Sequence, residues 1–399
     1  MRRASDAERE RLHDTFAALC RIESPSGQER AVADWVTREL RGMGLEVDED
    51  DAGPRVGSNA GNLLARIPGA GGAGSRSILL CAHMDTVPLT APVEPVLING
   101  GWTNAGDGIL GADNKSAVAV IIELARRLTR SGSTPPTVGV EMLFTVCEEI
   151  SLLGAREFDA SRLDSRYGYV FDHATPIGDI VLAAPSLHRM VAEFHGRAAH
   201  AGVRPEDGRS AIAAAARAIA AMRLGRLDVE TTANVGTIRG GTAINVVPER
   251  CRIEAEVRSV DQQRVETVAT EMIDHMQDAA DAAECDLDIT VERMIQGYRT
   301  RPKAVQVAVA ERALEACGYA PRHITTGGAS DANALEAAGL PCTNLADGTE
   351  HNHEPTERIS VDALEGLLEL VIALVVRSGG DIGGGSAAPD GGASAGGTA

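Results

Sequence analysis

The sequence predicts an α/β protein in which a larger domain with a largely parallel sheet contains an inserted, smaller α+β domain. Three observations lead to this prediction. The chain has 399 residues and 44% of them are hydrophobic, which is enough for more than one core. Helical and strand patterns alternate near both ends of the chain, as expected for helices packed on a parallel sheet. Between these parts the order changes to strand, helix, strand, strand, helix, strand.

The larger domain is predicted in two segments, residues 1–183 and 297–376. In the first, helices at 31–43 and 116–130 alternate with apolar strands at 78–81, 138–146 and 169–171. In the second, helices at 304–317 and 331–338 alternate with strands at 323–325 and 342–345. The apolar run 367–376 is interrupted by Glu369 and is too short to span a bilayer, so we expect a buried terminal helix.

The inserted domain is predicted at residues 184–296. Its strands are expected at 189–195, 234–238, 252–258 and 287–292, with helices at 210–222 and 262–283. This order is that of a ferredoxin-like domain. After Arg377 the chain is rich in Gly, Ala, Ser and Asp with almost nothing to bury, which predicts a disordered tail at 377–399.

Charge and cysteine content exclude several classes of function. A formal net charge of −19 disfavours nucleic acid and anionic membranes as partners. The first ten residues are charged and lack the apolar core of a signal peptide. Seven scattered cysteines without a CxxC pair indicate reduced thiols. Together these features predict a cytoplasmic enzyme.

Histidine and acidic residues recur at the ends of predicted strands in the larger domain. Open α/β sheets bind ligands at the carboxyl ends of their strands, so we expect these side chains to converge. Each cluster alone has an ordinary explanation, such as a surface turn, a helix N-cap or solvated acids, but five together favour a common site. In chain order the clusters are His83 with Asp85, Asp113, Glu148 with Glu149, Asp172 with His173, and His351 with His353.

The residue types in these clusters point to metal chemistry. His83 can offer one ring nitrogen to a metal while Asp85 accepts a hydrogen bond from the other. Asp113 has two carboxylate oxygens with which to bridge two cations. The adjacent Glu148 and Glu149 repel each other unless a cation compensates, which suggests one ligand and one general base. The mixed nitrogen and oxygen set suits zinc, with cobalt or manganese as substitutes. The sequence has neither HExxH nor a Walker A motif.

These clusters, with further motifs, resemble the M20 metallopeptidase family over residues 24–359. The segments around His200 and around 330–333 are similar to peptidase T and its relatives. The supporting motifs are Ser-Pro-Ser-Gly-Gln-Glu at 24–29, the HxD at His83, Gly-Ala-Asp-Asn-Lys at 111–115, Glu148-Glu149, Asp172, Gly-Arg-Ala-Ala-His-Ala-Gly at 196–202, Asn-Val-Val-Pro-Glu at 245–249, Glu-Val-Arg-Ser at 256–259, Gly-Gly-Ala-Ser-Asp-Ala-Asn at 327–333, and residues 353–357.

The resemblance implies a hydrolase that cleaves amide bonds of small peptides with two divalent metal ions. Such ions lower the pKa of a shared water, and the general base takes its proton. His353 is preferred to His351 as a ligand because it preserves the family's spacing to a following acid and isoleucine. The implied assignments are His83 and Asp172 on one metal, Glu149 and His353 on the other, Asp113 as the bridge, Glu148 as the general base and Asp85 as the partner of His83.

The resemblance also implies a homodimer formed through the inserted domain. His200 is then expected to reach the partner's active site and stabilise the oxyanion when the domains close. Arg258 is expected to bind a substrate carboxylate with two hydrogen bonds. Asn245 and the loop at 327–330, with Gly328 and Ser330, are expected to hold the substrate's backbone or carboxylate.

Two alternatives to a di- or tripeptidase remain open. An N-acyl amino acid deacylase or a glutamate-releasing carboxypeptidase would use the same metal residues on another substrate. A non-catalytic protein of this fold would bind a ligand without turnover, and it would have no need of Glu148.

Overall fold

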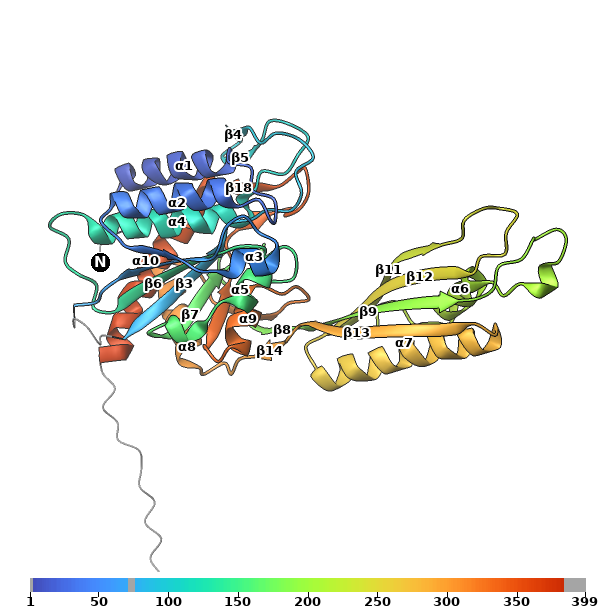
Figure 1. Cartoon of the computed structure of the whole chain (residues 1–399). Helices are drawn as coiled ribbons and strands as arrows, with labels where there is room; N and C mark the ends of the chain where they lie inside the picture. Colours follow the sequence, from blue (N-terminus) through green and yellow to red (C-terminus); the bar gives the residue numbers. More distant parts are fainter. Residues whose placement is uncertain (1–2, 71–75, 384–399) are drawn as a thin grey trace, which may run out of the picture.

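The structure is a computed structural model that describes residues 3–70 and 76–383. Figure 1 shows two bodies joined end to end: a sheet with helices on both faces, and a separate sheet with helices on one face. The predicted fold class is confirmed, because the central strands of the larger sheet are parallel and the inserted segment forms its own antiparallel sheet.

The larger sheet has nine strands in the order β1-β2-β6-β3-β7-β16-β8-β14, with β15 also paired to β8. Its middle strands β6, β3, β7 and β16 run parallel, and most are buried along their full length, as expected for parallel strands covered by helices on both faces. The bounds are β1 Val47–Glu49, β2 Leu63–Ile67, β3 Ser77–His83, β6 Gly139–Thr145, β7 Ser165–Phe171, β8 Asp179–Ala184, β14 Tyr298–Arg299, β15 Arg322–Thr325 and β16 Cys342–Leu345.

Helices cover both faces of this sheet, because alternate side chains of each strand point in opposite directions. Leu80 and Ala82 of β3 pack into the core that contains α1, α2, α4, α8 and α10, whereas Leu79 and Cys81 face the core near α9. The bounds are α1 Asp6–Cys20, α2 Arg30–Gly42, α3 Ala52–Val56, α4 Ala112–Thr129, α5 Leu153–Glu157, α8 Val305–Cys317, α9 Asp331–Ala337 and α10 Val361–Gly383.

A small antiparallel sheet, which the sequence patterns did not predict, joins distant parts of the larger body. Its order is β17-β18-β5-β4. The strands are β4 Pro95–Ile98, β5 Gly101–Asn104, β17 Thr349–Glu350 and β18 Arg358–Ser360. Pairing of β18 with β5 places the segment between β17 and β18 next to the start of α4.

The inserted segment has the predicted ferredoxin-like arrangement. Its strands are antiparallel in the order β10-β11-β12-β9-β13, and α6 and α7 pack on one face. Ser210 and Asp261 cap the two helices with side-chain hydrogen bonds. The bounds are β9 Ser186–His195, α6 Ala211–Ala221, β10 Gly225–Arg226, β11 Thr231–Gly240, β12 Arg250–Ser259, α7 Gln262–Ala282 and β13 Asp286–Ile295.

The chain crosses between the two bodies after β8 and after β13. Asn333 of α9 lies at both crossings, where its Nδ2 donates to the carbonyl oxygens of Pro185 at 3.3 Å and Gln296 at 3.0 Å. On the basis of these contacts, we propose domain boundaries near residues 184 and 296.

The prediction of a disordered tail is wrong for its first residues, because α10 continues to Gly383. Ser378 is fully buried, and Gly379 packs so closely that a Cβ there would lie 2.8 Å from Thr137 Cβ. Packing therefore extends the helix where composition alone indicated disorder. The remaining tail, residues 384–399, lies outside the described residues. Among the described residues, no helix has the length and apolar character to cross a membrane.

Candidate metal centre

Six side chains singled out from the sequence meet where the parallel strands end. Within the described residues, three overlapping groups have ligand atoms within 4.8 Å of one another. They are His83–Asp113–Asp172, Asp113–Glu149–His353 and His83–Glu148–Glu149. The grouping arises because β3, β6 and β7 are parallel neighbours, so their carboxyl ends share one edge of the sheet.

The first group surrounds His83, the last residue of β3. Its Nε2 lies 3.1 Å from Asp113 Oδ1 and 4.0 Å from Asp172 Oδ1. Asp113 stands at the beginning of α4, where the next residue, Asn114, donates from Nδ2 to the carbonyl oxygen of Phe171 at 2.7 Å. This bond ties the start of α4 to the end of β7. Both elements therefore bring a carboxylate to the imidazole at the end of β3.

The second group uses the other oxygen of Asp113. His353 Nε2 lies 3.0 Å from Glu149 Oε1 and 3.3 Å from Asp113 Oδ2. His351 lies outside all three groups, and its Nδ1 is 3.7 Å from Glu354 Oε2. Asp113 therefore presents one oxygen to each of two histidine–carboxylate groups, the arrangement expected of a residue that bridges two cations.

Asp85 positions both a histidine and the glutamate pair. His83 Nδ1 lies 3.4 Å from Asp85 Oδ1 and 3.0 Å from its backbone oxygen. Asp85 Oδ1 accepts the backbone N–H of Glu148 at 3.0 Å, and Oδ2 accepts that of Glu149 at 3.2 Å and the Ser26 hydroxyl at 2.6 Å. Asp85 is fully buried, so it orients the ring of His83 without facing solvent.

The crowded acids strongly perturb each other's protonation. Burial, and then the charge of Asp172, raise the pKa of Glu148 well above its usual value. Burial and Asp113 do the same to the pKa of Asp172. Although burial opposes the shift, hydrogen bonds from His353 and His83 hold the pKa of Asp113 below its usual range.

The two histidines carry the opposite perturbation. Hydrogen bonds to Asp113 and Glu149 raise the pKa of His353 to about 10. Burial alone would lower the pKa of His83, but hydrogen bonds to Asp113 and Asp85 hold it well above its usual value. The site thus has more carboxylates than histidines, and its histidines are drawn towards the charged form. Such a donor set fits divalent cations, which supply the missing positive charge.

Glu357 and Asn352 were not given a role from the sequence, yet both hold Asp113 in place. Glu357 Oε2 accepts the backbone N–H groups of Leu110 and Gly111, each at 2.8 Å, and Oε1 accepts that of Asp113 at 3.0 Å. Burial raises the pKa of Glu357 to about 7. Asn352 Nδ2 donates to Asp113 Oδ2 at 2.9 Å. The fixed spacing from His353 to a following acid was the only sequence signal for Glu357.

Two further buried acids were given no role from the sequence, although Asp331 lies within the motif at 327–333. Asp347 follows β16 and is fully buried, and burial raises its pKa to about 8. Its position after a strand is the signal that could have found it. Asp331 begins α9, where its Oδ2 accepts from the Thr145 hydroxyl at 2.5 Å and from Cys81 Sγ at 3.8 Å. Its Oδ1 has no hydrogen-bond partner among the described residues.

His200 and Asn245 lie together in the inserted domain, away from the metal groups of the same chain. Their loops follow β9 and β11, which run parallel to each other away from the larger body (Figure 1). Ala201 N–H donates to the Asn245 carbonyl oxygen at 2.9 Å, and both predicted residues are exposed. One chain therefore brings these two residues to each other and not to its own cluster.

The other predicted substrate residues have structural partners. Arg258 makes two parallel hydrogen bonds to Glu256, from Nε at 3.0 Å and from Nη2 at 3.1 Å. Ser330 is buried and forms a capping box with Asn333 at the start of α9. Gly328 is exposed in the loop before that helix.

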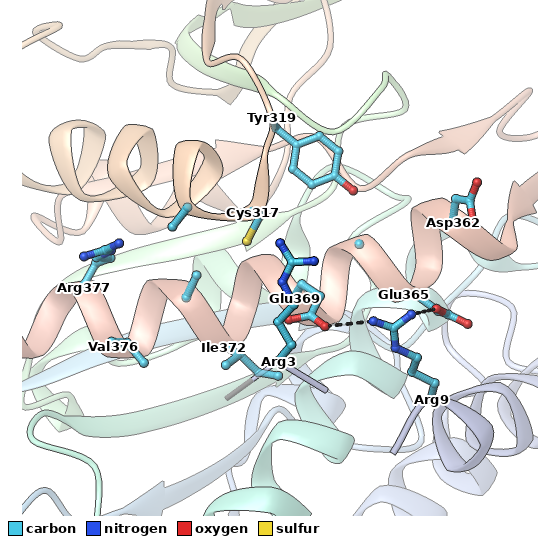
Figure 2. A pocket seen from close by; sticks show the side chains of 13 residues that line it. Arg3, Arg9, Cys317, Tyr319, Asp362, Glu365, Glu369, Ile372, Val376 and Arg377 are labelled. Carbon is cyan, nitrogen blue, oxygen red and sulfur yellow. Dashed lines mark hydrogen bonds and ion pairs between the residues drawn. The ribbon is translucent and has the colours of Figure 1, made fainter. Parts of the chain in front are cut away.

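A separate cavity lies between α1, α8 and α10 (Figure 2). It encloses about 480 Å³, and Arg9 inside it pairs with Glu365 at 2.5 Å and Glu369 at 3.2 Å. None of the predicted site residues lines it, so it is not the candidate site.

Models of two peptidase families match parts of the chain. The M20 peptidase dimerisation domain matches residues 183–284, and peptidase family M28 matches residues 62–192. An uncharacterised Bacillus subtilis protein, YqjE, is 35% identical over 92% of this chain and 97% of its own length.

Two solved structures are similar over nearly the whole chain. Aminopeptidase PepT from Bacillus cereus is 37% identical, with a TM-score of 0.83, over 92% of this chain and 98% of its own. A tripeptidase from Staphylococcus aureus is 31% identical, with a TM-score of 0.86, over 92% and 98%. The resemblance drawn from the motifs is thereby confirmed. The chain belongs to the M20 peptidase family, in its peptidase T-like branch, and is a peptide-bond hydrolase.

Proposed function

We propose that this enzyme hydrolyses short peptides, tripeptides among them, at a site that holds two divalent metal ions. The observation that carries the proposal is that the two oxygens of Asp113 face different histidines, His83 at 3.1 Å and His353 at 3.3 Å. Asp172 would complete the first metal position and Glu149 the second. The names of the similar aminopeptidase and tripeptidase support the choice of substrate.

The donors fit zinc best, since imidazole nitrogen and carboxylate oxygen are both common zinc ligands. Cobalt or manganese would fit the same set. Bound there, the cations supply a Lewis acid for the scissile carbonyl and make a water molecule acidic enough to act as the nucleophile.

Glu148 is proposed as the general base. It is buried beside the cluster but belongs to neither of the two groups that share Asp113. Its raised pKa suits a group that takes a proton from water and delivers it to the leaving amine. Asp85 keeps both Glu148 and His83 in place through its carboxylate.

A homodimer through the inserted domain would complete the site. His200 is exposed in the loop after β9, a strand that runs away from the larger body (Figure 1), so we assign it to the oxyanion of the partner's site. Large apolar side chains exposed in the same domain, Val203, Ile238 and Ile244, support an interface there. Asn245 accompanies His200 in this role because its carbonyl oxygen accepts from the backbone N–H of Ala201, the residue after His200.

Arg258 is proposed to bind the substrate's carboxylate, since a guanidinium can hold a carboxylate with two hydrogen bonds. Gly328 has exposed backbone that a peptide can approach, and Ser330 supports that loop by its capping box. A cytoplasmic location is supported by all seven cysteines being free thiols.

The test is metal analysis combined with a substrate panel. Purified enzyme loaded with zinc, cobalt or manganese is assayed on dipeptides, tripeptides and N-acetyl amino acids. We expect close to two metal ions per chain and hydrolysis of tripeptides. Turnover of acylated amino acids alone would make the enzyme a deacylase, and one metal per chain would remove the bridging role of Asp113.

A further inference from the structure

The open face of the inserted sheet carries a ladder of arginine–glutamate pairs. Along β12 the odd-numbered residues are buried against α6 and α7, so the even-numbered ones project from the other face. The pairs are Arg252 with Glu193 at 2.8 Å and with Glu254 at 3.2 Å, Arg189 with Glu254 at 2.5 Å, and Arg258 with Glu256 at 3.0 Å. Each of these three guanidinium groups thus has a carboxylate beside it.

Part of this ladder, Arg189 with Glu254 and Arg258 with Glu256, borders a cavity that also reaches the segment after Glu149. The cavity encloses about 520 Å³ and has Arg258 and Glu256 in its lining. Ile150 and Ser151 line it from the larger body, and they directly follow Glu149. A peptide held at the metal centre would therefore extend towards the Arg258–Glu256 pair.

Glu256 occupies the donors that a substrate carboxylate would use. Arg258 Nε donates to Oε1 and Nη2 to Oε2, so one edge of the guanidinium already holds a carboxylate in the two-bond geometry. The side chains are 33% and 37% exposed, so an incoming ligand can reach the pair. The negative charge of Glu256 also opposes a second carboxylate at the same place.

We propose that Glu256 is a specificity-determining residue that stands in for the substrate's terminal carboxylate and is displaced when a peptide binds. The inference rests on the proposed role of Arg258 in carboxylate binding. Its consequence is that Glu256 lowers the affinity for peptides with a free carboxyl terminus, and only for these. A partly exposed pair of this kind changes an affinity by about two- to fivefold.

The test uses a tripeptide and its C-terminal amide as matched substrates for the metal-loaded enzyme. Glu256→Gln is expected to lower KM for the free acid about two- to fivefold, while KM for the amide does not fall. Glu193→Gln is the control, because Glu193 pairs in the same ladder but does not line the cavity. A KM for the free acid that rises or stays the same in Glu256→Gln would overturn the proposal, because a residue that merely braces Arg258 gives that result.

A double variant separates this inference from the function on which it rests. In Arg258→Met, the Glu256→Gln substitution should lower KM for the free acid less than it does when Arg258 is present, because no guanidinium is left to be freed. If the wild-type enzyme cleaves neither peptide, the proposed substrate is wrong. Calorimetric titration of the two peptides then still decides the role of Glu256, because tighter binding of the free acid by Glu256→Gln supports it and equal binding refutes it.

Discussion

Asp85→Asn tests whether the buried carboxylate behind His83 organises the metal centre. Asp85 is fully buried, and its two oxygens have different partners. Oδ1 accepts from the backbone of Glu148 and faces His83 Nδ1, and Oδ2 accepts from the backbone of Glu149 and from Ser26. Asparagine has the same shape but replaces one of these acceptors with an NH2 group.

The magnitude follows from this count of donors. Whichever way the asparagine amide turns, its NH2 faces a backbone N–H that now lacks an acceptor. A buried donor left unpaired costs about 1–3 kcal/mol, which is about 5- to 150-fold in an equilibrium constant. Loss of the carboxylate behind a metal-binding histidine typically lowers metal affinity or activity by about 10- to 100-fold. This range lies within the one expected from the unpaired donor.

The assay is zinc affinity in the presence of a competing chelator, together with kcat/KM on a tripeptide. We expect both to fall by about 10- to 100-fold in Asp85→Asn. Asp288→Asn is the matched control, because Asp288 also pairs with a histidine, His195, but is 86% exposed in the inserted domain. If Asp85→Asn binds zinc and turns over as the wild type does, Asp85 does not organise the site and the reasoning fails.

Three further results are expected. Glu148→Ala should abolish turnover while metal content stays near two per chain, and retained turnover would remove Glu148 as the base. Burial raises the pKa of Asp331 to about 6, above its unfolded value of 3.8. The folded state therefore binds this proton more tightly than the unfolded state, and the free energy of unfolding falls as the pH rises from about 4 to 6. Asp331→Asn should lose this part of the pH dependence in urea unfolding of the metal-free protein, and an unchanged dependence would contradict the assignment. Gly379→Val should lower the free energy of unfolding by about 1–3 kcal/mol, because the added side chain overpacks against Thr137. Gly380→Val is the control and should lower it less, because a Cβ at Gly380 meets nothing within 4 Å. Equal losses in the two variants would contradict tight packing at Gly379.

Much of the fold could be predicted because it depends on periodicity within single elements. The buried strands β3 and β6 are mainly apolar, and α6 and α7 begin at capping residues that the sequence shows directly. The short strands β17 and β18 could not be found in this way, because two or three residues carry no period. The last turns of α10 were missed because Gly379 reads as a helix breaker unless its contact with Thr137 is known.

The residues of the site likewise divide into those that a local sequence pattern predicts and those that it does not. His83, Glu148 and Asp172 were identified because each stands where an apolar strand ends, and parallel neighbours deliver such residues to one edge. Glu357 and Asn352 had no such signal. They act on Asp113 through contacts that span 244 and 239 residues of the chain, and no local pattern encodes such a distance.

The sequence by itself determined that the side chains following β3, β6 and β7 meet at one edge of the sheet, because strand polarity carries them there. Only the tertiary structure decided how they face one another. It turned the two oxygens of Asp113 towards different histidines, placed His353 and not His351 beside Glu149, and paired Arg258 with Glu256. These outcomes depend on side-chain orientation and on packing between segments far apart in the chain, which the order of residues does not specify locally.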